Sequence, residues 1–463
     1  MSERNSGGTS RREFLKNTSR IAVASAVAGA AAPHVHAAEK NTIKVALIGC
    51  GGRGTGAAAN AMSVTQGPVK LVAMADVFEN RLSASFHNLS SKFANKMDVP
   101  EDRKFCGFDS YQQAMDCLDP GDVAIFATPL AFRWVHFGYA IRKGLNVFME
   151  KPLTADGPTS RRMLKLAEEA TAKNLKVAVG LMSRHSRALQ ELHGRIQDGE
   201  IGDIVTMRAY RMTGPVGSAF SEKWPGEPSE LLWQIKRFHS FIWASGGCFN
   251  DFYIHVIDHS CWMKNALPIK AQALGGRHYR NSPGGKPCVD QNFDSYSVEY
   301  TFADGARLIM DGRCVAGCDN FYSSYLHGTK GSAIGSKAGD CGQPSSIFAG
   351  QNPDHSKRTW ESKVPKNERN PYENEWNDLV DAIRNDRPYN EVKYGVEASL
   401  VSSLGRKAAH TGQEITFDEM LNSDQEYAPG VDQFAMDSPA PLRADADGNY
   451  PIPMPGIKKD TEY

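Results

Sequence analysis

One stretch near the start of the 463-residue chain decides its fold: Ile43-Lys44-Val45-Ala46-Leu47-Ile48-Gly49-Cys50-Gly51-Gly52-Arg53-Gly54. An apolar, β-branched run leads into a G-x-G-x-x-G turn, and an alanine-rich helical segment follows. In such a turn Gly49 permits the tight bend, Gly51 lets a pyrophosphate approach the backbone, and Gly54 lets the helix lie close to the strand. The N–H groups at the helix start would hold the phosphates. The stretch therefore predicts a dinucleotide-binding βαβ unit.

An acidic residue, Asp76, ends the second predicted strand about 22 residues beyond Gly54. A carboxylate at this place can accept hydrogen bonds from the adenosine ribose hydroxyls. Because it would repel a 2′-phosphate, we expect NAD as the cofactor, with NADP possible. Arg53 and Arg81 could each stack on adenine or bind a phosphate, and Arg53 could equally be a solvent-exposed loop cation.

Beyond this turn, the pattern of expected strands and helices changes at about residue 182. Up to that point, short β-branched runs alternate with helical stretches, the pattern of parallel βαβ units. Strands are expected at 42–48, 69–75, 123–127, 146–149 and 176–180, with helices such as 133–143 and 159–173 between them. The sequence thus predicts an α/β fold that begins with a Rossmann dinucleotide-binding domain over residues 42–182.

Residues 183–428 predict a C-terminal α+β domain with an open, mostly antiparallel sheet, because the expected strands follow each other closely and are joined by turns. The expected strands are 204–212, 270–274, 295–302, 306–312 and 322–328, with a helix over 249–264 packed on them and helices at 372–385 and 395–412. Residues 339–370 are expected to be loop and insertion. The Pro-, Asp- and Gly-rich residues 429–463 are expected to form an extended tail.

The composition excludes several classes of partner and site. Lys and Arg number 53 and are balanced by 53 Asp and Glu, so we expect neither a nucleic-acid partner nor an anionic membrane surface, both of which need a basic excess on one face. The nine cysteines show no C-x-x-C pair and no matching His spacing, so we expect no metal site.

The N-terminus resembles a twin-arginine export signal. Ser-Arg-Arg-Glu-Phe-Leu-Lys at 10–16 precedes an apolar run over 21–32 and the small-residue cleavage pattern Val35-His36-Ala37. The apolar run is too short to span a bilayer, which takes roughly 20 residues. We therefore expect residues 1–37 to be a signal peptide read by the twin-arginine machinery, and the mature protein to be periplasmic and soluble without stable membrane insertion. The alternative is a disordered tail.

Three further segments have the pattern of a known family. They are Ala127-Thr128-Pro129 with His136, the Glu150-Lys151-Pro152 triplet after a strand, and Gly246-Gly247 followed by Asp251-x-x-x-His255. Together they resemble the Gfo/Idh/MocA oxidoreductases, which include glucose–fructose oxidoreductase and inositol dehydrogenase, over roughly residues 42–421. The resemblance implies a carbohydrate or polyol substrate, and the open face of the predicted sheet suggests a homo-oligomer, either a dimer or a tetramer. The resemblance also implies that the cofactor is bound by Gly49, Gly51, Gly52, Arg53, Gly54, Asp76, Thr128, Pro129, His136, Glu150 and Lys151.

The chemistry of alcohol oxidation explains why such residue types are needed. Removing a hydride from a secondary alcohol carbon leaves a carbonyl only if the hydroxyl proton also departs to a base. His255 is the candidate base, and Asp251, one helical turn earlier, would orient the imidazole or bind a neighbouring hydroxyl. Lys151 would stabilise developing alkoxide charge. Taken alone, the Asp/His pair could be a helix-surface contact and Glu-Lys-Pro a strand-ending turn.

Two further residues, Arg184 and Tyr253, are expected to bind substrate. Arg184 follows the last strand of the first domain, where the resemblance implies a contact with cofactor or substrate, and an ordinary loop position is its alternative. Tyr253 joins Trp233, Trp243 and Phe252 as a possible stacking platform for a sugar ring. A core position is the ordinary alternative for aromatic residues, so we expect one or two of the four to serve.

Export shapes the expected function, because a periplasmic enzyme has no soluble nicotinamide pool. We expect an exported NAD(P)-dependent oxidoreductase acting on a sugar, polyol or glycoside secondary alcohol, with the cofactor tightly held and regenerated within the cycle. Two alternatives stay open. One is a redox-neutral glycosidase resembling the NAD-dependent glycoside hydrolase family 109, and the other is a non-catalytic sugar-binding protein on the same fold.

Overall fold

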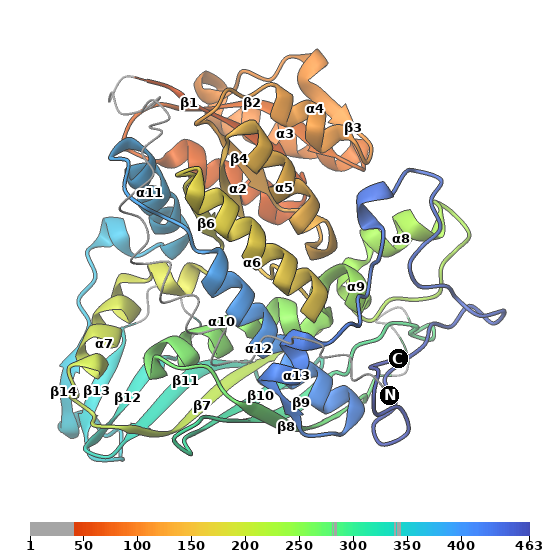
Figure 1. Cartoon of the computed structure of the whole chain (residues 1–463). Helices are drawn as coiled ribbons and strands as arrows, with labels where there is room; N and C mark the ends of the chain where they lie inside the picture. The colour runs from red at the N-terminus through yellow and green to blue at the C-terminus, as the bar shows by residue number, and fades with distance from the viewer. Residues whose placement is uncertain (1–40, 280, 282–284, 338, 340–343) are drawn as a thin grey trace, which may run out of the picture.

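A computed structural model describes residues 41–279, 281, 285–337, 339 and 344–463. The predicted export signal at 1–37 lies outside this range. Two sheets and the helices that cover them make up the described chain (Figure 1). Among the helices of that part, none is long and apolar enough to cross a membrane.

The first sheet is parallel throughout, with strand order β3-β2-β1-β4-β5-β6. Its strands are nearly fully buried except for the edge strand β3, as expected for a sheet with helices on both faces. The strands are β1 (Ile43–Ile48), β2 (Val69–Asp76), β3 (Lys104–Cys106), β4 (Val123–Phe126), β5 (Asn146–Met149) and β6 (Val177–Val179), and the helices of this region are α2 (Gly52–Ser63), α3 (Glu79–Phe93), α4 (Ser110–Asp116), α5 (Arg133–Lys143) and α6 (Gly157–Ala172). The order reverses between β1 and β4, which places the ligand crevice at their carboxyl ends.

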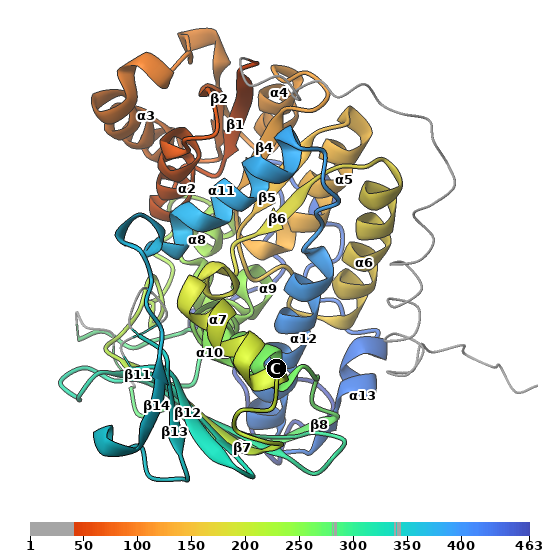
Figure 2. The ribbon, with the colours of Figure 1, turned by 90° about the vertical axis from the view of Figure 1, so that its left-hand side faces the viewer.

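The second sheet has nine strands in the order β14-β13-β12-β11-β7-β10-β9-β8-β15. All neighbours pair antiparallel except β7 with β10. The strands are β7 (Ile204–Thr213), β8 (Lys270–Gly276), β9 (Ser295–Thr301), β10 (Arg307–Cys314), β11 (Phe321–Gly328), β12 (Gly331–Ser336), β13 (Ser346–Ala349), β14 (Arg358–Glu361) and β15 (Ile415–Thr416). In Figures 1 and 2 helices lie on one face of this sheet, so the predicted fold class is confirmed.

The expectation of a loop over 339–370 is wrong in part, because β13 and β14 lie there. Their segments are short, and β12 before them is Gly-Ser-Ala-Ile-Gly-Ser, a sequence of low β-propensity. Backbone pairing to β11 and its neighbours, rather than side-chain pattern, forms these strands.

The helices after the first sheet connect the two regions. They are α7 (Arg187–Gln197), α8 (Glu230–Lys236), α9 (Ile242–Ser245), α10 (Gly247–Lys264), α11 (Pro371–Arg384), α12 (Val392–Thr411) and α13 (Phe417–Asn422). The α11 helix returns to the first sheet, where Trp376 stacks on Phe148 of β5 with ring centroids 4.6 Å apart. Residues 42–182 therefore do not form the whole of the first core, and the boundaries at 182 and 428 stay predictions.

The C-terminal residues 429–463 contain one short 3-10 helix, Val431–Gln433, and otherwise consist of turns, bends and segments without regular secondary structure. Tyr450 stacks on Trp233 of α8, which ties the tail to the second region. Glu462 near the end of the tail is fully buried, whereas residues 454–457 and 459–461 are exposed, so one buried side chain anchors a tail whose last residues lie mostly at the surface.

Candidate active site

A cavity of about 1080 Å³ opens at the carboxyl ends of the first sheet and reaches the second sheet. One wall is formed by the turn after β1, the end of β2 and the segment after β4. The opposite wall comes from α10, β7 and β11, through residues such as Asp251, Arg211 and Tyr322. Residues far apart in the sequence thus share one cavity, in the crevice predicted by the strand order.

The glycine turn has the geometry that a pyrophosphate needs. Gly49 has φ of +97°, and a Cβ there would lie 2.6 Å from the carbonyl carbon of Ala127. A Cβ on Gly54 would lie 1.8 Å from the Gly49 oxygen. A Cβ on Gly51 or Gly52 would have no other atom within 4 Å, and both residues line the cavity. Two glycines therefore allow the close packing of helix and strand, and two leave room for a dinucleotide backbone.

The Asp76 carboxylate lies at the end of β2 and lines the same cavity. Its two oxygens accept the backbone N–H groups of Cys50 (2.7 Å) and Phe78 (2.8 Å), which fix its orientation. Burial raises the pKa of Asp76 from its ordinary value. Each oxygen keeps a further lone pair that can accept a ribose hydroxyl, so the turn and this carboxylate fit NAD.

Two predicted cofactor ligands, Arg53 and Glu150, are paired with each other. The Arg53 Nε lies 2.5 Å from a Glu150 oxygen, its Nη2 lies 3.3 Å from Glu375, and its guanidinium stacks over the Tyr372 ring. Both residues line the cavity. Their charges are satisfied within the protein, so a direct contact with the cofactor stays a prediction.

Thr128 lies in the segment that follows β4, and His136 lies in the first turn of α5. Thr128 Oγ1 lies 3.3 Å from His136 Nδ1, and both residues, with Pro129, line the cavity. Burial, assisted by Arg133, lowers the pKa of His136 to about 3, so the ring is neutral. Arg133 donates to the carbonyl oxygens of Phe126 (2.8 Å) and Thr128 (2.9 Å) and thereby fixes this connection.

Lys151 and Asp251 meet across the cavity. Lys151 follows β5, and its Nζ donates to the Asp251 carbonyl oxygen at 2.7 Å and lies 3.6 Å from the Asp251 carboxylate. Burial opposes the ionisation of Asp251, but Lys151, His239 and His255 outweigh it and hold the pKa of Asp251 well below its usual range. The carboxylate is therefore ionised at neutral pH.

His239, which sequence reasoning missed, also contacts that carboxylate. Its Nε2 lies 3.1 Å from Asp251 Oδ2. Its Nδ1 accepts the backbone N–H of Ser218 at 3.1 Å, and since a backbone N–H can only donate, Nδ1 is unprotonated. The proton is then on Nε2 and is donated to Asp251. No local pattern marks His239, because its partners lie 21 residues before it and 12 residues after it.

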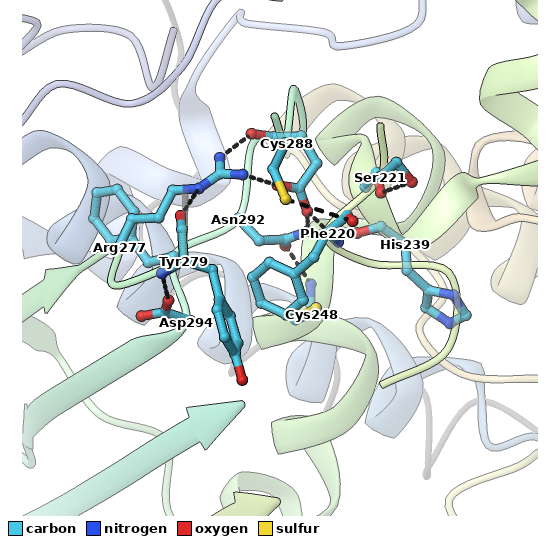
Figure 3. A network of polar contacts seen from close by, with 12 residues as sticks. Phe220, Ser221, His239, Cys248, Arg277, Tyr279, Cys288, Asn292 and Asp294 are labelled. Carbon is cyan, nitrogen blue, oxygen red and sulfur yellow. Dashed lines mark hydrogen bonds and ion pairs between the residues drawn. The ribbon is translucent and has the colours of Figure 1, made fainter. Parts of the chain in front are cut away.

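A buried network holds this part of the wall in place (Figure 3). The Asn292 amide accepts the backbone N–H of Cys248, in the first turn of α10, at 2.7 Å and donates to the His239 carbonyl oxygen at 2.7 Å. It also donates to Asp290, which is ion-paired with Arg277 at 2.6 Å. One side chain therefore links the His239 segment to the helix that carries Asp251.

His255 lies one turn after Asp251 on α10 and lines the cavity, as the i, i+4 spacing predicts. Tyr253 does not. It is displaced by about 200° around the helix from Asp251, and it is fully buried with its hydroxyl 3.3 Å from Cys314 Sγ. The structure therefore places Tyr253 in the core between α10 and the sheet, which corrects its assignment to the substrate.

Arg184 is also absent from the residues that line the cavity. Its guanidinium binds both oxygens of Asp258 on α10, with Nη2 at 2.8 Å. The 3-10 helix Met182–His185 turns Arg184 toward α10, and Met182 lines the cavity in its place. The predicted substrate contact of Arg184 is thus replaced by an internal ion pair.

Of the four aromatic candidates, Phe252 lines the cavity and stacks on His239 with centroids 5.2 Å apart. Trp233 and Trp243 are buried in the core that α8 and α9 share with the tail. Arg211 and Tyr322 line the cavity from the second sheet and were not predicted.

Family models match two adjoining parts of the chain. Residues 43–181 match "Oxidoreductase family, NAD-binding Rossmann fold", and residues 189–334 match "GFO/IDH/MocA C-terminal domain". Inositol 2-dehydrogenase from Corynebacterium glutamicum is 27% identical over 104 residues, 22% of this chain and 30% of the relative. The enzyme of the same name from Leifsonia xyli subsp. xyli is 27% identical over 126 residues, 27% of this chain and 35% of the relative. The chain thus aligns with about a third of the length of these curated relatives.

Solved structures share the fold over most of the chain. An aldose–aldose oxidoreductase from Caulobacter crescentus, complexed with glycerol, has a TM-score of 0.60 and 16% identity, covering 81% of this chain and 100% of that one. A levoglucosan dehydrogenase in complex with NADH and levoglucosan has a TM-score of 0.61 and 18% identity, with the same coverage. A myo-inositol 2-dehydrogenase from Lactobacillus plantarum has a TM-score of 0.57 and 22% identity, covering 81% and 99%.

Proposed function

The chain belongs to the Gfo/Idh/MocA oxidoreductase family and carries its NAD-binding Rossmann domain, and on that premise we propose that it oxidises a secondary hydroxyl of a sugar or polyol with NAD. The names of two similar proteins, inositol 2-dehydrogenase and levoglucosan dehydrogenase, support this substrate class. NAD bound on the Gly49–Gly54 turn would supply the hydride acceptor.

The contact between Lys151 and Asp251 carries the proposal. It brings the residue after β5 and the residue on α10 together inside the cavity that the glycine turn lines. The Lys151 ammonium can donate to the substrate hydroxyl oxygen and stabilise negative charge that develops there. Asp251, ionised and held by His239, can bind a neighbouring hydroxyl.

We assign His255 as the base that takes the hydroxyl proton, because it lines the cavity one helical turn from Asp251. His239 cannot take this role without losing its bond from Ser218, since its Nδ1 lone pair is already used. The two histidines thus have different roles: His239 orients the Asp251 carboxylate, and His255 accepts the proton of the substrate hydroxyl.

The test is to purify the protein, denature it and identify the released nucleotide by chromatography and mass spectrometry. We expect NAD or NADH, and reduction of bound NAD when inositols and monosaccharides are added. Lys151→Met should retain the nucleotide and abolish this reduction. Protein that carries no nicotinamide, binds none when it is supplied and oxidises no polyol would refute the proposal and would favour a non-catalytic sugar-binding protein.

We further propose that the protein is exported by the twin-arginine route with its cofactor resident. The support is the Arg11-Arg12 pair with its apolar run and cleavage pattern. Cell fractionation should find the wild-type chain in the periplasm and the Arg11→Lys/Arg12→Lys variant in the cytoplasm. An equal distribution of the two would contradict export by this route.

A resident cofactor must be regenerated within the catalytic cycle. Reduction of a second carbonyl substrate would do so, and the name of the Caulobacter crescentus neighbour, aldose–aldose oxidoreductase, favours this scheme. Transient oxidation and re-reduction of one glycoside, with cleavage of its bond, is the other scheme. Mass spectrometry of the products separates them: a lactone or keto sugar supports coupled oxidoreduction, and a cleaved glycoside of unchanged oxidation state supports the redox-neutral glycosidase.

A further inference from the structure

Arg211 stands at the end of an apolar row on β7. Side chains alternate between the two faces of a strand, so Arg211 shares a face with Met207 and Ala209, which are fully buried. At Arg211 this face reaches the cavity. The register places Tyr322 of β11 directly opposite, and the Arg211 guanidinium carbon lies 4.1 Å from the centre of the Tyr322 ring.

The other arginines that line the cavity each donate to an acceptor of the protein, although the Nε of Arg133 is buried without a partner. Arg53 is paired with Glu150, Arg81 donates to the Lys236 carbonyl oxygen at 3.3 Å, and Arg133 donates to two carbonyl oxygens. Arg211 differs from them, because within the described residues its guanidinium neither donates a hydrogen bond nor forms an ion pair, and its Nε is buried.

A second arginine on the same strand shows the contrast. Arg208 points to the opposite face of the sheet, where it is ion-paired with Asp311 at 2.9 Å. A cation that is taken partly out of water needs an anion or several acceptors. Arg211 lies in such a place, and its stacking on Tyr322 orients the guanidinium while its buried Nε remains unpaired.

The charge in the substrate half of the cavity points to a monoanion. The positive charge of Lys151 is balanced by Asp251, whereas that of Arg211 has no carboxylate partner among the described residues. The planar guanidinium fork matches a carboxylate in a bidentate arrangement. We propose that the substrate is an acidic sugar or polyol whose carboxylate binds Arg211 while its reacting hydroxyl lies at Lys151. This inference rests on the proposed function and names its substrate class.

The test compares acidic and neutral forms of the same sugar on the NAD-loaded full chain. Glucuronate is paired with glucose and galacturonate with galactose, and glucose 6-phosphate and glucose 6-sulfate are separate arms because they share anionic oxygens. For the wild-type protein we expect kcat/KM to be about 100-fold higher for the uronate than for its neutral partner, carried mainly by KM. In Arg211→Ala this ratio should fall to about 1, and Arg211→Lys should restore part of it.

Arg208→Ala is the matched control, since it removes an arginine of the same strand from the other face and should leave the ratio unchanged. Equal use of acidic and neutral sugars by the wild-type protein, or an unchanged ratio in Arg211→Ala, would overturn the inference. Preference for the phosphate or sulfate ester over the uronate would overturn the carboxylate assignment.

A failure of the proposed function looks different, because then no sugar of either kind is oxidised. If Arg211→Ala does not fold, Arg211→Lys with the thermal shift caused by glucuronate decides: we expect the shift seen with the wild-type protein to be reduced, and an equal shift in both proteins counts against the inference.

Discussion

Asp251 and Glu462 are two carboxylates held ionised by the same kinds of neighbour in two different places. Asp251 has Lys151 and His239, and Glu462 has Arg406 (2.9 Å to each oxygen), His410 (2.8 Å) and the Tyr427 hydroxyl. For both, burial opposes ionisation, but a neighbouring cation together with hydrogen-bond donors outweighs burial and holds the pKa well below its usual range. Asp251 lines the cavity with 13% of its side chain exposed, whereas Glu462 is 0% exposed.

The difference shows that a shifted pKa does not by itself mark a catalytic group. The same electrostatics anchor the end of the chain in one place and prepare a binding surface in the other, and access to a cavity decides between the two. Glu462 also neutralises Arg406, which donates to the carbonyl oxygens of Ala155 (3.0 Å) and Gly246 (3.1 Å). The pair of Arg406 and Glu462 therefore contacts the segments that lead to Asp251 and that follow Lys151.

Asp251→Asn should give the largest loss of activity, and it tests the role of the carboxylate that lines the cavity. We expect kcat to fall by about 1,000-fold, because the neutral amide neither keeps Lys151 paired nor binds substrate as an anion does. The unfolding temperature should change little, since cavity water can solvate Lys151. Steady-state kinetics and thermal unfolding check this, and a loss of stability without loss of kcat would assign Asp251 a structural role.

Glu462→Gln should show the reverse pattern. It leaves the buried Arg406 charge uncompensated, which costs about 3–5 kcal/mol in comparable pairs. We expect a clear fall in the unfolding midpoint in denaturant, with kcat at low temperature within about threefold of the wild type. Glu414→Gln is the control, because the Lys270–Glu414 pair is exposed and should contribute at most about 1 kcal/mol. A parallel fall in kcat would mean that the tail acts on the site through Arg406.

A third buried cluster, around His185, shows the opposite direction of pKa shift. Burial disfavours the charged His185 ring, but Glu391 and Asp378, 3.2 and 2.7 Å from its nitrogens, outweigh burial and raise the pKa of His185 to about 10. A raised pKa in the folded state stabilises the fold fully below the unfolded value, near 6.5, and this contribution is lost as the pH rises through about 10.

We therefore expect wild-type stability to fall between pH 7 and pH 10 by on the order of 2–3 kcal/mol more than that of His185→Gln. Denaturant unfolding at a series of pH values measures this. Parallel curves for the two proteins would show that His185 does not carry the proton in the folded state.

His239→Phe, which keeps the ring but removes both nitrogens, should give the smallest effect and tests the hydrogen bond that His239 makes to Asp251. Without the Nε2–H donor the pKa of Asp251 should rise toward its ordinary value, so the acid limb of the pH–kcat/KM profile should move to higher pH. At pH 7 we expect only about a tenfold loss of kcat/KM. An unshifted acid limb would show that His239 does not act on Asp251.

Some features of this molecule could be predicted from local sequence because they depend on local backbone geometry. The glycine turn, the carboxylate at the end of β2 and the i, i+4 pair on α10 are all of this kind. Glycine spacing sets which turn is possible, and helical periodicity sets which side chains share a face. These positions lie where the pattern predicts.

Other features were decided by packing between distant segments. Arg184 and Tyr253 were expected at the substrate and instead contact Asp258 and Cys314, while His239 and Arg211 reach the cavity without any sequence signal. The strands β13 and β14 likewise depend on pairing with a neighbouring strand.

The sequence by itself determined a Rossmann domain followed by an open sheet and the nucleotide turn, because glycine placement and periodicity act over a few residues. Only the tertiary structure decided which cation meets which carboxylate, and that Glu462 at the chain end is buried on Arg406. The physical reason is that an ion pair depends on distance in space, and the partners at Lys151 and Asp251 or at Arg406 and Glu462 are separated by tens of residues whose path only the packed core determines.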